Sequence, residues 1–209
     1  MYILYKLNKM NLSFLKKKPI PIHDPKVIID KDGIRFEKVK DNVFNIKFSI
    51  LNNRVNLPNV INFSFVRLIY DLNPDVYDYV DVKISDDGNE ALFLVTMKHF
   101  FKEFGLPQRY SSLQVVKMIN HEQNMIEFYG KTNPSEKPLH LPKKAELLPL
   151  EHMNIQCIIV SNHEVEFRVE LIFENNFTLI PMIEKLAGKI LHKIFNNTKL
   201  FIQSMSPLI

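Results

Sequence analysis

Apolar and polar residues alternate along most of this chain with a period of two. The pattern is clearest in residues 44–50 and 165–171, where every second side chain is apolar. Successive side chains of a β-strand point to opposite faces of a sheet, so this pattern buries one face and leaves the other in water. It therefore predicts an antiparallel sheet. Further strands are expected at residues 27–29, 34–36, 80–84, 91–97, 113–119, 125–129 and, as a buried strand, at 155–160.

Short turns rich in Asp, Asn and Gly separate several of these strands. Residues 30–33 contain Asp32 followed by Gly33, and residues 86–89 contain Asp87 followed by Gly88. Such pairs adopt the positive φ angles that tight hairpin turns require. The sequence therefore predicts that neighbouring strands are connected as hairpins.

One segment near the end changes to a helical period. Thr178 could accept the first free N–H groups as an N-cap, and lysines line the side opposite the apolar residues. We expect the apolar side to pack on the sheet, although a basic amphipathic helix could also lie on a membrane surface. The apolar side comprises Leu179, Ile183, Leu186, Ile190 and Ile194, and the opposite side Lys185, Lys189 and Lys193.

A second, shorter helix is expected at residues 98–105, where Gly105 would end it. The fold class predicted from these patterns is α+β, with an antiparallel sheet packed against two or more helices. A flexible basic N-terminal arm would precede this body. Residues 27–209 would form a single globular domain, with an exposed, proline-containing loop at residues 131–144.

The basic excess of the chain is confined to the arm. Residues 1–26 hold six lysines and one acid, whereas residues 27–209 hold 21 lysines and arginines and 22 acids. Prolines at 19, 21 and 25 prevent a continuous helix or a central strand there. Lysines on such an arm attract phosphate, on anionic lipids or on nucleic acid, although they could equally be a solvated terminus. The candidate membrane- or nucleocapsid-binding residues are Lys6, Lys9, Lys16, Lys17 and Lys18.

Catalytic and metal-binding patterns are missing from the sequence. Cys157 is the only cysteine, which excludes an internal disulfide or a cysteine-based zinc site and favours a reducing, intracellular setting. Cys157 could be a nucleophile with His140 or His163 as its base, but its apolar neighbours are more typical of a buried thiol. We therefore expect no enzyme, no catalytic residue, no metal and no cofactor. No apolar run approaches the roughly 18 residues that span a bilayer, and the start lacks the features of a secretory signal.

Two stretches carry a resemblance to a known family. The segments at 35–38, 44–50 and 52–54, and those at 165–173 and 181–183, resemble the matrix proteins of rhabdoviruses, in particular the vesiculovirus type. The resemblance extends to residues 130–132 and to the lysine- and proline-bearing arm, which lie at positions similar to those of the matching segments in that family. The resemblance implies an α+β fold and a structural, non-enzymatic adaptor.

By this resemblance the chain would bind the inner face of the envelope or plasma membrane and the viral nucleoprotein–RNA complex. It would self-associate into a lattice and drive assembly and budding, with the viral glycoprotein tail and host budding factors as possible partners. Its place would be the virion beneath the envelope, and the cytoplasm and inner membrane face of the infected cell. The family's Pro-Pro-x-Tyr motif is missing from the arm. The arm would instead contribute to self-association through Pro19, Ile20, Pro21 and Ile22.

A second hypothesis is a carrier for a small hydrophobic ligand. In this arrangement a curved antiparallel sheet wraps around the helix at residues 179–195 and encloses an apolar pocket. A solid core without any cavity would argue against this hypothesis. An enzyme that uses Cys157 is the third alternative.

Overall fold

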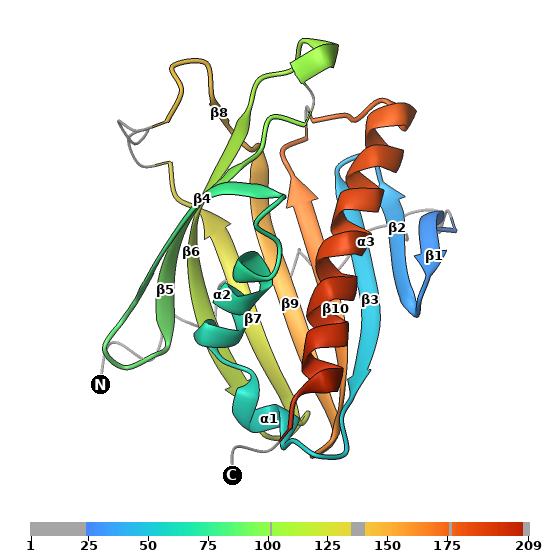
Figure 1. The fold of residues 1–209 in the computed structure, drawn as a ribbon, viewed down its shortest axis with the longest axis vertical. Coiled ribbons are helices and arrows are strands. Elements are labelled where there is room, and N and C mark those ends of the chain that lie inside the picture. The colour runs from blue at the N-terminus through green and yellow to red at the C-terminus, as the bar shows by residue number, and fades with distance from the viewer. Residues whose placement is uncertain (1–23, 101, 135–140, 176, 207–209) are drawn as a thin grey trace, which may run out of the picture.

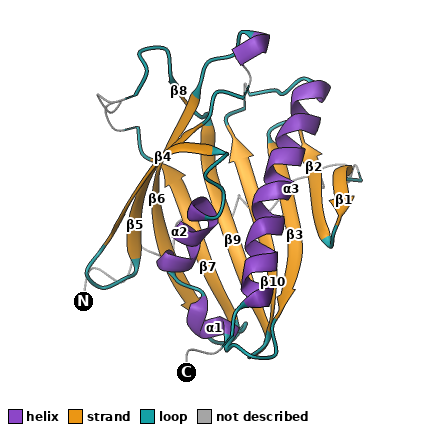
Figure 2. Ribbon diagram, in the orientation of Figure 1, coloured by secondary structure: helices purple, strands orange, loops and turns teal. Residues whose placement is uncertain are grey.

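The computed structural model describes residues 24–100, 102–134, 141–175 and 177–206. In this part of the chain, one large sheet carries its α-helices on a single face (Figure 1; Figure 2). The strands are β1 (Lys26–Lys31), β2 (Ile34–Lys40), β3 (Val43–Leu51), β4 (Tyr77–Ile84), β5 (Glu90–Met97), β6 (Arg109–Asn120), β7 (Met125–Thr132), β8 (Glu146–Leu147), β9 (Leu150–Ser161) and β10 (Glu164–Phe173). The helices are α1 (Leu57–Val60), α2 (Phe63–Asp71) and α3 (Pro181–Ser204), with a 3₁₀ turn η2 at Lys102–Phe104.

The strand order across the sheet is β1-β2-β3-β10-β9-β7-β6-β5-β4, and the short β8 pairs with β6. All pairs are antiparallel except β6 with β8. Because β3 pairs with β10 along nine residues, the last strand lies beside an early one, and the helix that follows it crosses the middle of the sheet. Figure 1 shows α3 in front of β10 and β3, with α2 in front of β7. The predicted α+β class and antiparallel sheet are confirmed.

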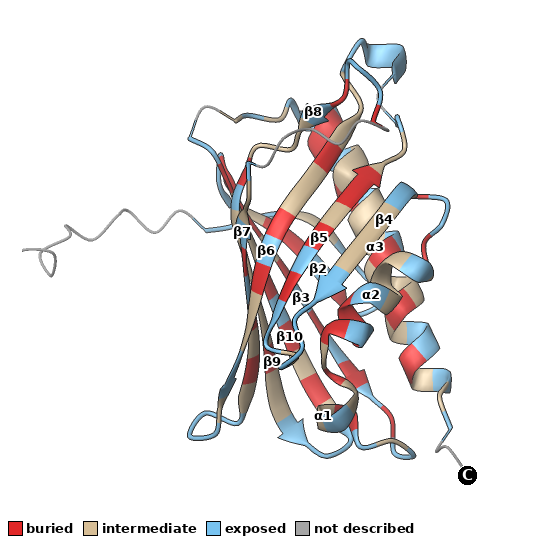
Figure 3. Cartoon of the chain, turned by 90° about the vertical axis from the view of Figure 1, so that its left-hand side faces the viewer, coloured by how far each residue is buried: buried red, intermediate tan, exposed pale blue. Residues whose placement is uncertain are grey.

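The period-two pattern places a continuous apolar layer on the face that the helices cover. On β3, Phe44, Ile46, Phe48 and Ile50 are at most 5% exposed. Figure 3 shows the helices on one side of the sheet, with buried residues concentrated between the two layers. The alternation therefore predicted which face of the sheet is buried.

The hairpin turns are as the sequence predicts. Asp32 and Gly33 have φ angles of 53° and 71° between β1 and β2, and Gly88 has a φ of 67° between β4 and β5. Positive φ at both central residues is the geometry of a two-residue hairpin turn.

The strand expected to be buried at 155–160 is buried only in part. Within β9, Cys157 is 0% exposed, whereas Val160 is 57% exposed. An apolar run inside a sheet with one wet face must still place alternate side chains in water. The expectation is therefore wrong for the residues of this run that face outward.

The C-terminal helix is longer than predicted and begins elsewhere. Its N-cap is Ile180 and not Thr178, and Pro181 occupies the first turn, where its missing N–H is harmless. Of the predicted apolar side, Ile183 and Ile194 are buried, whereas Leu186 and Ile190 are half-buried and Leu179 precedes the helix. The fully buried positions of α3 are Ile183, Glu184, Gly188, Ile194, Thr198 and Ile202.

The segment between β3 and β4 holds two helices that the strand pattern did not predict. Asn62 caps α2 by accepting a hydrogen bond from the backbone N–H of Phe65 at 3.1 Å. The helix expected at 98–105 is reduced to η2, and Gly105 ends it with a φ of 69°.

Candidate functional site

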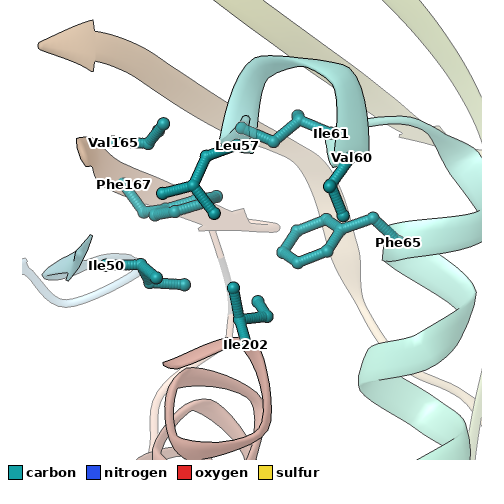
Figure 4. Close-up of a pocket in the computed structure, with 8 residues that line it drawn as sticks. All are labelled: Ile50, Leu57, Val60, Ile61, Phe65, Val165, Phe167 and Ile202. Atoms are coloured by element: carbon teal, nitrogen blue, oxygen red, sulfur yellow. The ribbon is translucent and has the colours of Figure 1, made fainter. Parts of the chain in front are cut away.

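The space between the sheet and the helices contains a small void near α1. Its walls come from α1 and α2, from the sheet, and from the last turn of α3. Figure 4 shows these side chains pointing toward one another. The lining residues are Ile50, Leu57, Val60, Ile61, Phe65, Val165, Phe167 and Ile202, all of them apolar.

A second void lies farther along, between α2, α3 and the middle of the sheet. It shares Phe65 and Phe167 with the first void, which we call the α1 void. We call the second the central void. The remaining lining residues of the central void are Phe48, Val66, Ile69, Phe128, Ile155, Cys157, Val169, Phe195 and Thr198.

Each void has a volume of about 10 Å³. That is close to the minimum space that one water molecule needs. Aromatic rings fill the rest of this region: Phe48 stacks on Phe167 with ring centroids 4.8 Å apart, and Phe195 lies 5.2 Å from Phe48. In this conformation the interior is therefore closed and largely packed.

The side chains that line the two voids are almost entirely hydrocarbon. The hydroxyl of Thr198 is already donated to the carbonyl oxygen of Ile194 at 2.9 Å. Burial raises the pKa of the Cys157 thiol, so this side chain is a neutral, weakly polar group. Such a lining can solvate an apolar chain, but it supplies no acid, base or nucleophile at neutral pH.

Helix α3, which forms one wall of both voids, is held at its N-terminal end by a buried ion pair. The Glu184 carboxylate accepts hydrogen bonds from Lys38 at 2.6 Å and from Lys26 at 2.9 Å. Burial acts to raise the pKa of Glu184, but the hydrogen bonds from Lys38 and Lys26 outweigh it, so the pKa lies below its ordinary value. One turn farther on, Gly188 leaves so little room that a Cβ would lie 3.1 Å from both Ile28 and Phe36.

The other end of α3 is held by the segment that follows β3. The side-chain amide of Asn52 donates to the carbonyl oxygens of Ile202 at 2.6 Å and Met205 at 3.0 Å. The carbonyl oxygen of Ile202 also accepts from the backbone N–H of Met205 at 3.2 Å, so Asn52 adds a side-chain cap to the last turn of the helix. The helix is thus attached at both ends to the N-terminal part of the sheet.

Helix α2 is attached to α3 at its C-terminal end. Asn73 is 0% exposed, donates to the carbonyl oxygen of Ile69 at 2.7 Å and accepts from the amide of Asn197 at 2.9 Å. An ion pair between Asp75 and Lys193 lies beside it. The two helices are therefore joined beyond the central void, on the side away from α1.

The site residues proposed from the sequence lie outside the described residues. This applies to the basic candidates Lys6, Lys9, Lys16, Lys17 and Lys18, and to the self-association candidates Pro19, Ile20, Pro21 and Ile22. Strand β1 begins at Lys26, the last residue of the expected arm.

The alternative of a cysteine nucleophile finds no support in the geometry. Cys157 is buried, and the ring of His163 lies in the β9–β10 turn with Nδ1 3.0 Å from the carbonyl oxygen of Val55. His140 lies outside the described residues. Across the described ranges, no three His, Cys, Asp or Glu side chains gather as a metal site. Nor does any described helix combine the length and the apolar character needed to cross a bilayer.

The fold defines an α+β protein in which a curved antiparallel sheet packs around a long C-terminal helix. No family model matches the sequence, and no curated protein matches it. Solved structures, in contrast, share the fold over nearly the whole chain.

One such structure is the lipid transfer and protein localization domain of human StarD13 (DLC2), with a TM-score of 0.63 and 10% identity over 98% of both chains. Human StAR-related lipid transfer protein 5 has a TM-score of 0.60 and 8% identity, over 94% of this chain and 91% of that one. A STAR-related lipid transfer protein from Xanthomonas axonopodis has a TM-score of 0.58 and 11% identity, over 87% of this chain and all of the other. At these identities the likeness establishes the fold. All three are lipid transfer domains or proteins, and lipid transfer is carriage and not a reaction.

The resemblance to a rhabdovirus matrix protein is wrong, because the chain has the fold of these cellular and bacterial proteins. The two longest matched segments, residues 44–50 and 165–173, lie in strands β3 and β10, which pair with each other. Their alternation is what any antiparallel sheet with one buried face requires, so it carried no information about a family.

The functions drawn from that resemblance are wrong with it. The structural role in virion assembly and budding is one of them. The predicted partners are the others: an anionic membrane surface, the nucleoprotein–RNA complex, a self-associated lattice, a glycoprotein tail and host budding factors. The predicted location, beneath a viral envelope and at the inner face of host membranes, is wrong as well. What overturns them is the fold shared with lipid transfer proteins.

Sequence reasoning missed the helical wall of the site. Leu57, Val60, Ile61 and Phe65 come from a segment to which the sequence analysis assigned no structure. A signal was present: Asn62 is a good N-cap, and Phe63, Val66 and Tyr70 follow at helical spacing.

Proposed function

We propose that this protein is a carrier that binds an apolar ligand, a lipid or a lipid-like molecule, between the sheet and helices α2 and α3. The observation that carries the proposal is the fold, which matches lipid transfer proteins over nearly their whole length. The second hypothesis drawn from the sequence, a sheet wrapped around the C-terminal helix, has the same arrangement.

The lining of the two voids supports the proposal. Every residue of the α1 void is apolar, and the central void adds only Cys157 and Thr198. Transfer of a hydrocarbon chain from water to such a surface is favourable by about 25 cal/mol per Å² of buried area. A site of this kind selects apolar ligands by exclusion of water.

The size of the voids sets a condition on the proposal. A space of about 10 Å³ cannot hold a lipid, so the helices and rings must move apart when a ligand binds. Voids of this size are ordinary in a packed protein core, so they do not by themselves support the carrier hypothesis. They mark where packing is incomplete and where a ligand would begin to insert.

The proposal is tested by measuring the binding of cis-parinaric acid, an intrinsically fluorescent apolar probe, to the full chain. Val60→Phe adds bulk to the wall of the α1 void and should weaken binding. Val160→Phe makes the same change on the outer face of the sheet, where the side chain is 57% exposed, and should leave binding unchanged.

Mass spectrometry of lipids that co-purify with the full chain gives a second readout. If the wild-type protein neither binds the probe nor retains any lipid, it is not a carrier. If Val60→Phe and Val160→Phe bind equally well, the ligand does not occupy the proposed space.

The domain organisation belongs to the same proposal. Residues 27–209 would act as one carrier domain, with residues 1–26 as an arm and residues 131–144 as an exposed loop. Within that loop region β7 extends to Thr132, and β8 pairs with β6 beyond it.

A further inference from the structure

Phe65 separates the α1 void from the central void. Phe65 and Phe167 are the two residues that line both voids, and their ring centroids lie 5.9 Å apart. Each of the other described lining residues belongs to one void alone. Displacement of either ring would therefore join the two spaces.

The two rings differ in how firmly they are held. Phe167 lies on β10, which is paired on both sides, and its ring stacks on Phe48 with an interplanar angle of 4°. Phe65 lies in the first turn of α2, where its backbone N–H bonds the side chain of Asn62. The ring of Phe65 is the one that can move without disrupting the sheet.

The attachments of the helices indicate which element carries this movement. Helix α3 is tied to the sheet by Glu184 near its start and by Asn52 at its end. Helix α2 is joined to α3 through Asn73 beyond its C-terminal end, and its first turn is held against the sheet by the buried ring of Phe63, with no hydrogen bond to α3 within the described part of the chain. An outward movement of this turn would release Phe63 from the sheet while α3 stays in place.

We infer that Phe65 is a movable partition, and that its displacement with the first turn of α2 opens one elongated apolar chamber that takes a linear hydrocarbon chain. The chamber is elongated because its ends have separate walls: Leu57 and Ile202 at one end, Phe128 and Cys157 at the other. The Thr198 hydroxyl already bonds Ile194, so a polar head group has no partner inside and remains outside. This inference rests on the proposed carrier function.

The test compares Phe65→Leu with Phe44→Leu, using cis-parinaric acid as a linear probe. Phe44 lies on β3 and is 2% exposed, but it packs on Phe36 and Phe173 and lines neither void. Phe65→Leu makes the ring between the two voids smaller and should bind the probe several-fold faster and more tightly than wild type. Phe44→Leu should bind as wild type does, and thermal unfolding of both variants checks that each is folded.

The outcomes separate this inference from the proposed function. If wild type binds and both variants match it, the partition is overturned and the carrier function stands. If only Phe65→Leu binds, the partition stands and the wild-type chain is not a carrier. If no form binds, both are overturned.

The route of uptake is tested with a second pair of variants in stopped-flow measurements. Asn62→Ala removes the cap of α2 and should accelerate probe uptake, whereas Glu184→Gln loosens α3 and should leave the rate unchanged. The reverse pattern would assign the movement to α3. Displacement of the linear probe by cholesterol would overturn the assignment of a linear ligand.

Discussion

Glu184 has a side chain only 3% exposed, on the buried face of α3. Burial of a lone carboxylate is very costly, so this residue can exist there only with its partners Lys38 and Lys26. Removal of one partner would leave a buried charge. The ion pair therefore fixes where the start of α3 lies on β1 and β2.

We expect Glu184→Gln to lower the free energy of unfolding by about 2 kcal/mol at neutral pH, less than for a fully buried pair because Lys26 is 61% exposed. The pKa of Glu184 is lower in the folded state, so its contribution is present above the ordinary value of 4.5 and is lost as the pH falls through the folded pKa. Urea unfolding at neutral and acidic pH should therefore show the variant approaching wild type in acid. The exposed Glu174→Gln is the control, and a gap between Glu184→Gln and wild type that stays constant with pH would contradict the prediction.

Cys157 should be inert in the folded protein. Its side chain is buried in the sheet, and burial raises the pKa of the thiol, which keeps it protonated at neutral pH. We expect a thiol reagent such as Ellman's reagent to react slowly with the native protein and rapidly in denaturant. Fast reaction without denaturant would show that the middle of the sheet opens readily.

At the scale of elements, a side-chain cap helps to hold the C-terminal end of α3. Asn52 and its neighbour Asn53 are the same residue type in the same segment, but Asn52 is 4% exposed and Asn53 is exposed. The amide of Asn52 donates to two carbonyl oxygens at the end of α3, and Arg54 donates to two others there. Substitutions at Asn52 and Asn53 therefore separate the effect of the buried amide from the effect of a change in residue type.

We expect Asn52→Ala to reduce the free energy of unfolding by about 1–3 kcal/mol, because it removes the hydrogen bonds that the buried amide donates to the carbonyl oxygens of Ile202 and Met205. Asn53→Ala should change it by less than about 0.5 kcal/mol. Chemical denaturation monitored by circular dichroism measures both. Equal effects of the two substitutions would show that the cap contributes nothing specific.

At the scale of the whole molecule, β1 and β2 extend the sheet beneath α3. They supply Lys26 and Lys38 for Glu184, and Ile28 and Phe36 for the contact with Gly188. These two strands therefore support the helix that forms one wall of the proposed site, although they line neither void.

Deletion of residues 1–23 should leave unfolding and probe binding unchanged, because β1 begins at Lys26. Deletion of residues 1–40 removes β1 and β2 and should lower the melting temperature and abolish binding. Thermal unfolding and probe titration of both truncated chains check this. Retention of binding by the shorter chain would show that α3 needs no support from these strands.

Local pattern was enough to predict the sheet. The alternation of Phe44, Ile46 and Phe48 and the turn at Asp32 and Gly33 each depend on a few neighbouring residues, and the structure confirms them. The same locality explains the errors. Alternation is common to all antiparallel sheets with one buried face, so it led to the wrong family. The apolar run in β9 predicted a buried strand, although some of its side chains face outward.

The sequence by itself determined the α+β class, the buried face of the sheet and the presence of a C-terminal helix, because these follow from short-range periodicity. Only the tertiary structure decided which side of α3 is buried, since Glu184 needs Lys26 and Lys38 from strands far away in the chain. The same holds for the candidate site. Its walls join Leu57, Phe65, Phe167 and Ile202, which are brought together by the pairing of β3 with β10 and by the packing of the helices on the sheet.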